Sequence, residues 1–199
     1  ADFEKENFTP DKQIALLFPH IRDDVRVFTA TKTGTDSSYF YLNFRPEMHE
    51  RAKVLPQKIT ILWDNSNSAQ NRNIDKELSV LDTYLKSIGN VTVELVPFSI
   101  KAERAREFVV KNGDCSALKV AIKSLFNDGG TSFGAIQISL FKSDEILLFS
   151  DGLSNYGSTE PLFGTVPVYT INSALSANHS FLTYIAQRSG GTYLNLSRL

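Results

Sequence analysis

Short oxygen-bearing side chains follow an unbroken apolar run in the first half of the chain. Residues 59–63 are typical of a strand buried on both faces of a sheet, and Asp64, Ser66 and Ser68 come directly after it in the spacing Asp-x-Ser-x-Ser. Ligands of open α/β sheets bind at the carboxyl ends of the strands, so these side chains stand where a site is expected. Their oxygens suit Mg²⁺ or Ca²⁺ better than zinc or copper.

Two later turns carry side chains of the same kind. Thr131 follows a pair of glycines, and Asp151 precedes Gly152 at the end of another apolar run. The glycines let the backbone fold tightly, so that short side chains from separate loops can converge on one point. Two carboxylates and three hydroxyls would form an open six-coordinate site for Mg²⁺, with positions left for water or an incoming ligand.

Strand-like and helix-like segments alternate around these turns. In residues 74–88 the apolar positions recur every three or four residues, which indicates one face of a helix, and Gly89 ends it. Further strands are predicted at residues 91–98, 107–110, 145–150, 166–171 and 192–196. Further helices are predicted from Asp114 as N-cap to residue 125, at residues 132–141, and around residues 181–186. This alternation predicts an α/β fold, a doubly wound and mostly parallel sheet with helices on both faces.

The first part of the chain follows a different pattern. Residues 14–18 form a short apolar patch that predicts a helical turn, and residues 25–31 and 39–44 predict a β-hairpin. A charged linker at residues 47–57 then leads into the central strand. We therefore expect two parts: an N-terminal extension over residues 1–52 and the α/β domain over residues 53–199.

Composition excludes several classes of partner. The formal net charge is -1, so no global field attracts nucleic acid or anionic membrane, and no apolar run approaches the length that spans a bilayer. The arginine-rich residues 101–111 are interpreted as the coat of a solvated sheet edge, because stacking aromatics are not interleaved with the charges. The single Cys115 excludes an intrachain disulfide and is interpreted as a core thiol. No nucleic acid and no membrane insertion are therefore expected, and the sequence carries no signal for an oligomeric state.

The oxygen-rich turns resemble the von Willebrand factor A (vWA) family with its metal-ion-dependent adhesion site, called MIDAS. That signature is Asp-x-Ser-x-Ser after the first strand, a Thr in a later loop and an Asp after the fourth strand. The chain matches it in order at Asp64, Ser66, Ser68, Thr131 and Asp151. The resemblance covers about residues 53–199. One departure is Asn67-Ser68-Ala69, where many relatives have Gly-Ser-Met, and it puts the metal affinity in question while losing no ligand.

The resemblance has functional implications. It implies a non-enzymatic protein-binding module that holds Mg²⁺, with Mn²⁺ or Ca²⁺ as substitutes, and whose partner offers an Asp or Glu side chain. Residues 39–46 are further similar to the strand that leads into the A domain of inter-alpha-trypsin inhibitor heavy chains and their bacterial relatives, where a vault/inter-alpha-trypsin (VIT) domain precedes it. That likeness favours a secreted or cell-envelope location, although the chain begins without the basic and apolar regions of a signal peptide.

A serine hydrolase is the main alternative. The segment Gly-Thr-Ser-Phe-Gly around Ser132 fits Gly-x-Ser-x-Gly, and Ser132, Asp151 and His179 follow the chain order of an α/β-hydrolase triad. A nucleophile elbow needs a strand directly before the serine, whereas a helix and a glycine turn are predicted there. A metal site that has become vestigial, in a purely structural domain, is the second alternative.

Two simpler interpretations concern the individual residues. Asp64, Ser66 and Thr131 are also common helix caps, and Asp151 is a common turn residue. Asp64 at a strand end also fits an aspartyl-phosphate nucleophile, but such phosphatases resemble Asp-x-Asp, and here the second position is Ser66. Neither interpretation explains all five residues at their observed spacing.

Overall fold

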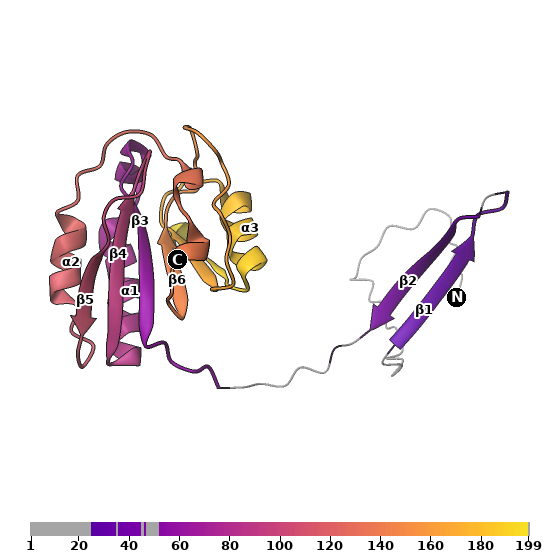
Figure 1. Cartoon of the computed structure of the whole chain (residues 1–199), viewed down its shortest axis with the longest axis horizontal. Coiled ribbons are helices and arrows are strands. Elements are labelled where there is room, and N and C mark those ends of the chain that lie inside the picture. Colours follow the sequence, from indigo (N-terminus) through magenta and orange to yellow (C-terminus); the bar gives the residue numbers. More distant parts are fainter. Residues whose placement is uncertain (1–24, 35, 45, 47–51, 199) are drawn as a thin grey trace, which may run out of the picture. The chain divides into compact units, whose positions relative to one another are not determined.

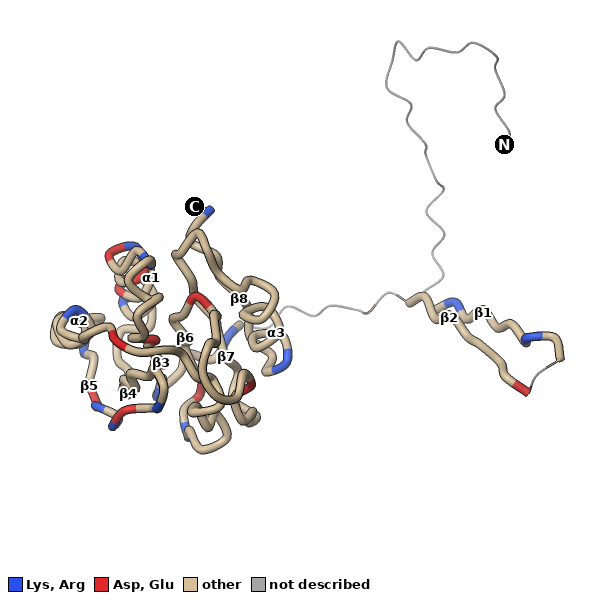
Figure 2. The backbone as a smooth tube through the Cα atoms, turned by 90° about the horizontal axis from the view of Figure 1, so that it is seen from above, with Lys and Arg blue, Asp and Glu red and all other residues tan. Residues whose placement is uncertain are grey.

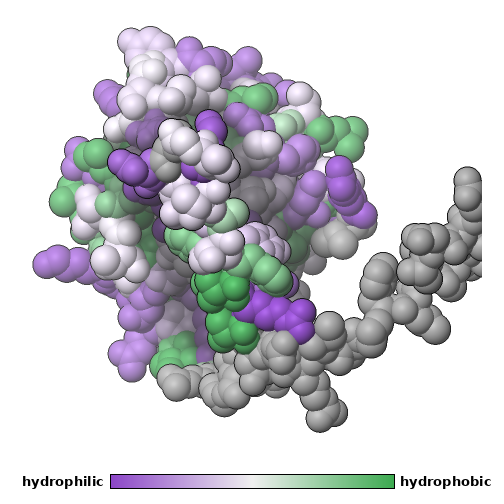
Figure 3. All heavy atoms as spheres, turned by 90° about the vertical axis from the view of Figure 1, so that its right-hand side faces the viewer, coloured by the Kyte–Doolittle hydropathy of each residue, from purple (hydrophilic) through white to green (hydrophobic). Residues whose placement is uncertain are grey.

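The computed structural model describes residues 25–34, 36–44, 46 and 52–198, and the chain divides into two compact units, Ala1–Ala52 and Lys53–Leu199. In the first unit, β1 (Val25–Thr31) pairs antiparallel with β2 (Ser38–Phe44), as the hairpin prediction stated (Figure 1). The apolar side chains of this hairpin are exposed. Hydrophobic and hydrophilic residues mix on the face of the chain that Figure 3 presents. The apolar patch at residues 14–18 lies outside the described residues.

The second unit is built on a six-stranded sheet in the order β5-β4-β3-β6-β7-β8. Its strands are β3 (Lys58–Asp64), β4 (Val91–Phe98), β5 (Arg106–Val110), β6 (Glu145–Phe149), β7 (Val168–Asn172) and β8 (Tyr193–Asn195). All neighbours pair parallel except the edge strand β5, which is antiparallel to β4. This sheet confirms the predicted α/β fold class.

Helices cover both faces of this sheet. Helix α1 (Ile74–Ile88) and helix α2 (Ser116–Lys123) pack their apolar sides with Ile61, Trp63 and Leu95 in one core. Helix α3 (His179–Ser189) and the segment around Phe133 pack with Leu62 and Leu148 in the other. Figure 1 shows α2 and α3 on opposite sides of the sheet. No helix among the described residues is long and apolar enough to cross a membrane.

Local signals explain where the longer helices begin and end. The Asn73 side chain accepts a hydrogen bond from the Lys76 amide at the start of α1, and Gly89 ends the helix with a φ of 85°. In α3 the Asn178 side chain accepts from the Phe181 amide, and Gly190 ends the helix in the left-handed region. The caps of both helices are thus residues other than the candidate ligands.

Two helix predictions are wrong in detail. Residues 132–141 form two short 3₁₀ turns, Phe133–Ala135 and Ile138–Leu140, in place of a helix. The reason is that a distant segment hydrogen-bonds to their backbone groups: the Gly134 amide donates to the Ser158 carbonyl, and the Leu162 amide donates to the Ile136 carbonyl. Helix α2 has Cys115 as N-cap, not Asp114. The Asp114 carboxylate instead accepts from the Ser116 amide and hydroxyl.

Candidate metal centre

Asp64 is the last residue of β3 and is fully buried. Its Oδ1 accepts a hydrogen bond of 3.0 Å from the Ser66 amide, and its Oδ2 accepts one of 2.6 Å from the Ser150 hydroxyl. Because Ser150 directly follows β6, the second bond joins the ends of neighbouring strands. The carboxylate is therefore held in one orientation at the carboxyl edge of the sheet.

Burial raises the pKa of the Asp64 carboxyl, because the charged form loses hydration. The Arg72 guanidinium and the hydrogen bonds from Ser150 and Ser66 act in the opposite direction. Arg72 is itself buried and donates from Nη2 to the Asp64 carbonyl at 2.5 Å. A cation beside Asp64 would favour the charged carboxylate further.

Ser66 and Ser68 carry the next two hydroxyls. Ser66 is fully buried, Ser68 is half-buried, and their Oγ atoms lie 3.2 Å apart. Ser66 is the N-cap of the 3₁₀ helix Asn67–Asn71, but its side chain makes no capping hydrogen bond. The capping interpretation is therefore wrong for Ser66, whose hydroxyl lies against Ser68 instead.

Thr131 is fully buried, and its Oγ1 has no hydrogen-bond partner among the described residues. The backbone on either side is firmly held: the Thr131 amide donates to Asn155 Oδ1 at 2.8 Å, and its carbonyl accepts from the Asn155 and Tyr156 amides. A buried hydroxyl without a partner costs free energy, and a cation bound at this position would offset that cost.

Asp151 is 1% exposed and directly follows Ser150. Its Oδ1 accepts from the Leu153 amide at 2.9 Å, and its carbonyl accepts from the Asn178 amide at the start of α3. Gly152 has a φ of 73°, and a Cβ there would lie 2.8 Å from Leu182 Cγ, so only glycine lets this turn pack against α3.

Two backbone hydrogen bonds and one side-chain hydrogen bond bring the three loops to one edge of the sheet. The Asp128 amide donates to the Asn65 carbonyl and the Asn67 amide to the Gly129 carbonyl, both at 2.9 Å. These bonds join the loop after β3 to the loop that carries Thr131. The bond between Ser150 and Asp64 attaches the loop of Asp151 to the same strand end.

The charges around this edge also suit a divalent cation. Asp64, Asp151 and Glu77 are buried carboxyl groups, whereas Arg72, 3.5 Å from Glu77, is the buried guanidinium among them. Ionised together, these groups carry a net charge of about -2, which a divalent cation would balance.

No group of three or more His, Cys, Asp and Glu side chains that could hold a metal exists in the described part of the chain, so a site here depends on hydroxyl oxygens. The five residues therefore fit a hard cation such as Mg²⁺.

No protein-family model matches the sequence, and no curated protein matches it either.

Solved structures do resemble the chain. An aerotolerance-related membrane protein from Bacteroides fragilis aligns with a TM-score of 0.51 and 16% identity over 69% of this chain and 90% of that chain. BatB from Bacteroides thetaiotaomicron aligns with a TM-score of 0.50 and 15% identity over 69% of this chain and 89% of that chain. A von Willebrand factor type A structure from Catenulispora acidiphila aligns at 0.48 and 17% identity over 70% of this chain and 38% of its own. The first two likenesses support the α/β fold, and at these identities they show the fold alone.

The residues of the hydrolase alternative have other contacts. Ser132 follows α2 and a loop, with no strand between them, and its amide donates to the Ser99 carbonyl. His179 Nδ1 is hydrogen-bonded to the Tyr193 hydroxyl at 2.7 Å. The strand-to-helix turn of a nucleophile elbow is thus absent from the described residues around Ser132.

Sequence reasoning missed three residues that support the centre: Arg72, Glu77 and Asn155. Glu77 had a readable signal, because it lies three residues after Ile74 and four before Leu81 and so falls on the apolar face of α1. A glutamate there must find a buried partner, and it has two, Arg72 and the Ser173 hydroxyl at 2.8 Å. Asn155 lies in an irregular loop and carries no comparable signal.

Proposed function

We propose that this chain is a non-enzymatic, divalent-cation-dependent protein-binding module. Asp64, Ser66, Ser68, Thr131 and Asp151 would hold Mg²⁺, with Mn²⁺ or Ca²⁺ able to replace it, and an Asp or Glu side chain of a partner protein would complete the coordination. When bound, the cation supplies a Lewis acid that accepts this carboxylate. The proposal rests above all on the Thr131 hydroxyl, which is buried and finds no partner in the part of the chain that the structure describes.

The residues of this chain have separable roles in the proposal. Asp64 would bring its negative charge in a fixed orientation, since Ser150 and the Ser66 amide hold its two oxygens. The hydroxyls would bring oxygen without charge, which leaves the cation electrophilic enough to attract an external carboxylate. An adhesion role at the cell surface or outside the cell, beside a VIT-like domain, would agree with the resemblance at residues 39–46.

Isothermal titration with Mg²⁺ and Mn²⁺ tests the proposal. The parent should bind one cation, whereas Asp64→Ala and Asp151→Ala should bind at least about tenfold more weakly, because each removes a ligand carboxylate. Asp75→Ala is the matched control, since Asp75 is exposed and pairs with the exposed Lys123. A parent that binds no metal would favour the structural domain with a vestigial site, and labelling of Ser132 by a fluorophosphonate would favour the hydrolase.

A further inference from the structure

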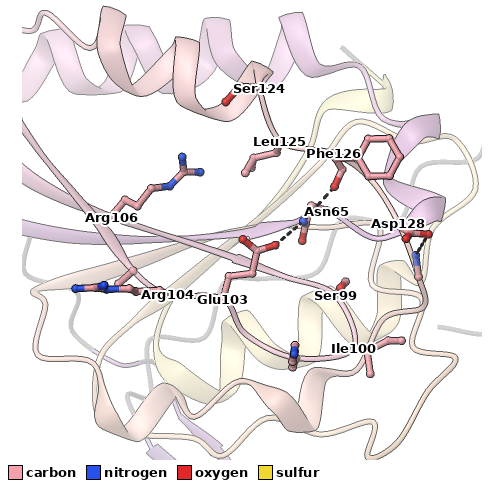
Figure 4. A pocket seen from close by; sticks show the side chains of 13 residues that line it. Asn65, Ser99, Ile100, Glu103, Arg104, Arg106, Ser124, Leu125, Phe126 and Asp128 are labelled. Atoms are coloured by element: carbon pink, nitrogen blue, oxygen red, sulfur yellow. Dashed lines mark hydrogen bonds between the residues drawn. The ribbon is translucent and has the colours of Figure 1, made fainter.

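A groove of about 1140 Å³ opens beside the candidate metal centre. It lies between the loop from β4 to β5 and the segment that follows α2, and its lining includes Asn65, Ile100, Arg104, Arg106 and Phe126 (Figure 4). Asn65 stands between the candidate ligands Asp64 and Ser66 in the chain, so the groove borders the loop that carries them, although none of the five candidate ligands lines it.

The groove offers free positive charge. Lys101, Arg104 and Arg106 are exposed, and none of them forms an ion pair with any residue that the structure describes. The groove also contains two carboxylates, but both already accept hydrogen bonds: Glu103 from Asn65 Nδ2 at 3.0 Å, and Asp128 from the Gly129 amide at 2.7 Å. Figure 2 shows basic and acidic positions next to each other along the loop between β4 and β5.

The floor of the groove is fixed and polar. Asn65 is 5% exposed, and its Nδ2 donates to both Glu103 and the Phe126 carbonyl, as the dashed lines in Figure 4 show. Its Oδ1 has no hydrogen-bond partner among the described residues. This oxygen is buried and so is not offered to an incoming segment, whereas the exposed Ile100 and Phe126 would give such a segment apolar contact at the rim.

The sheet register gives the distance between the two charged regions. Asp64 pairs with Phe98 of β4, and Arg106 of β5 pairs with Leu95, three residues earlier in β4. Three residues along a strand span about 10 Å, and two strand spacings across the sheet also span about 10 Å. The Cα atoms of Asp64 and Arg106 are therefore roughly 14 Å apart, which about four residues of extended chain would span.

We propose that this groove binds a second acidic side chain of the partner protein. Both acidic side chains belong to one segment of the partner, and the first of them completes the metal centre. The inference rests on the proposed function and makes it more specific: the partner presents an extended segment with acidic residues about four to five positions apart. Arg104 and Arg106 bind the second carboxylate, because guanidinium groups match carboxylates in geometry and charge. A nucleic acid fits less well, since the chain has a formal net charge of -1 and offers no global field that would attract a polyanion.

Two dye-labelled peptides test this inference by fluorescence anisotropy in Mg²⁺. One is Gly-Asp-Gly-Ser-Gly-Glu-Glu-Gly, and the other has Gln-Gln in place of Glu-Glu. The parent should bind the acidic peptide about fivefold more tightly than the Gln-Gln peptide, and high salt should reduce this ratio. Arg104→Ala combined with Arg106→Ala should abolish the ratio and leave Mg²⁺ titration unchanged, which also shows that the variant is folded.

The matched control removes two lysines at the opposite end of the sheet. Lys111 follows the far end of β5, and Lys142 precedes β6, and both are exposed. Lys111→Ala combined with Lys142→Ala should keep the fivefold ratio. If a parent that binds Mg²⁺ binds the two peptides equally, this inference is overturned and the proposed function is not. An equal loss of the peptide ratio in both double variants would likewise overturn only this inference. Equally tight binding of an oligothymidylate of the same charge would also overturn it, whereas a parent that binds no Mg²⁺ would overturn the proposed function.

Discussion

The Ser150 hydroxyl donates a 2.6 Å hydrogen bond to Asp64 Oδ2 and so joins the carboxyl ends of β6 and β3. Ser150 also accepts from the Gly152 amide at 3.0 Å, which places it at the base of the turn that carries Asp151. One side chain thus positions both candidate carboxylates relative to each other. Groups that orient metal ligands in this way affect affinity without touching the metal.

We expect Ser150→Ala to weaken Mg²⁺ binding by about tenfold, because Asp64 loses the bond that holds its Oδ2. Isothermal titration measures the change. Ser79→Ala, on the exposed side of α1, is the control and should bind as the parent does. Unchanged affinity in Ser150→Ala would show that the bond does not position a ligand.

Thr131→Val should have opposite effects without and with metal. Valine keeps the shape of threonine and removes a buried hydroxyl that no described residue satisfies, so the free energy of unfolding without metal should rise by about 1 kcal/mol. Added Mg²⁺ should then stabilise the variant less than the parent, because one ligand is lost. Thermal unfolding with EDTA and with Mg²⁺ measures both effects, and Thr131→Ser is the control that keeps the hydroxyl. A Thr131→Val variant that is destabilised in EDTA would mean that the hydroxyl has a structural partner.

The sequence predicts those parts of this fold whose signals are local. Helix α1 is readable because its apolar spacing lies between two capping residues, Asn73 and Gly89, and β3 because it is an unbroken apolar run. Residues 132–141 have helical spacing as well, but the segment around Ser158 and Leu162 takes their backbone groups, and no local pattern shows that competition.

The candidate site, too, is predictable from the sequence only in part. The types and order of the five oxygen ligands are visible in the sequence, because each follows a strand or a glycine turn. What requires the structure is the environment: the missing partner of Thr131 Oγ1, the Ser150 bond to Asp64, and the Arg72–Glu77 pair. These depend on burial and on contacts between residues far apart in the chain.

Arg72→Met should cost about 3–5 kcal/mol of folding free energy, since it leaves Glu77 and Asp64 buried without their cationic partner. Arg72 lies 3.5 Å from Glu77 and 4.9 Å from the centre of the Trp63 ring. Combining Arg72→Met with Glu77→Gln should recover part of the loss, because the unpaired charge disappears. Denaturant unfolding provides the measurement. The control Arg188→Met removes an exposed arginine over the Phe163 ring and should have little effect, so equal losses at the two sites would contradict a role for the buried pair.

Tyr84 should make stability depend on pH in the alkaline range. Burial and the hydrogen bond to Glu145 raise the pKa of Tyr84 to about 12, above the value of about 10 for an unfolded tyrosine. Its contribution to stability should therefore be complete below about pH 10 and be lost as the pH rises towards 12. Tyrosinate absorbance of the parent should show a late step that Tyr84→Phe removes, whereas the exposed Tyr156→Phe should keep it. Glu145→Gln should move this step to lower pH, because the neighbouring carboxylate that opposes ionisation is gone, and a step that stays in place would mean that burial alone raises the pKa.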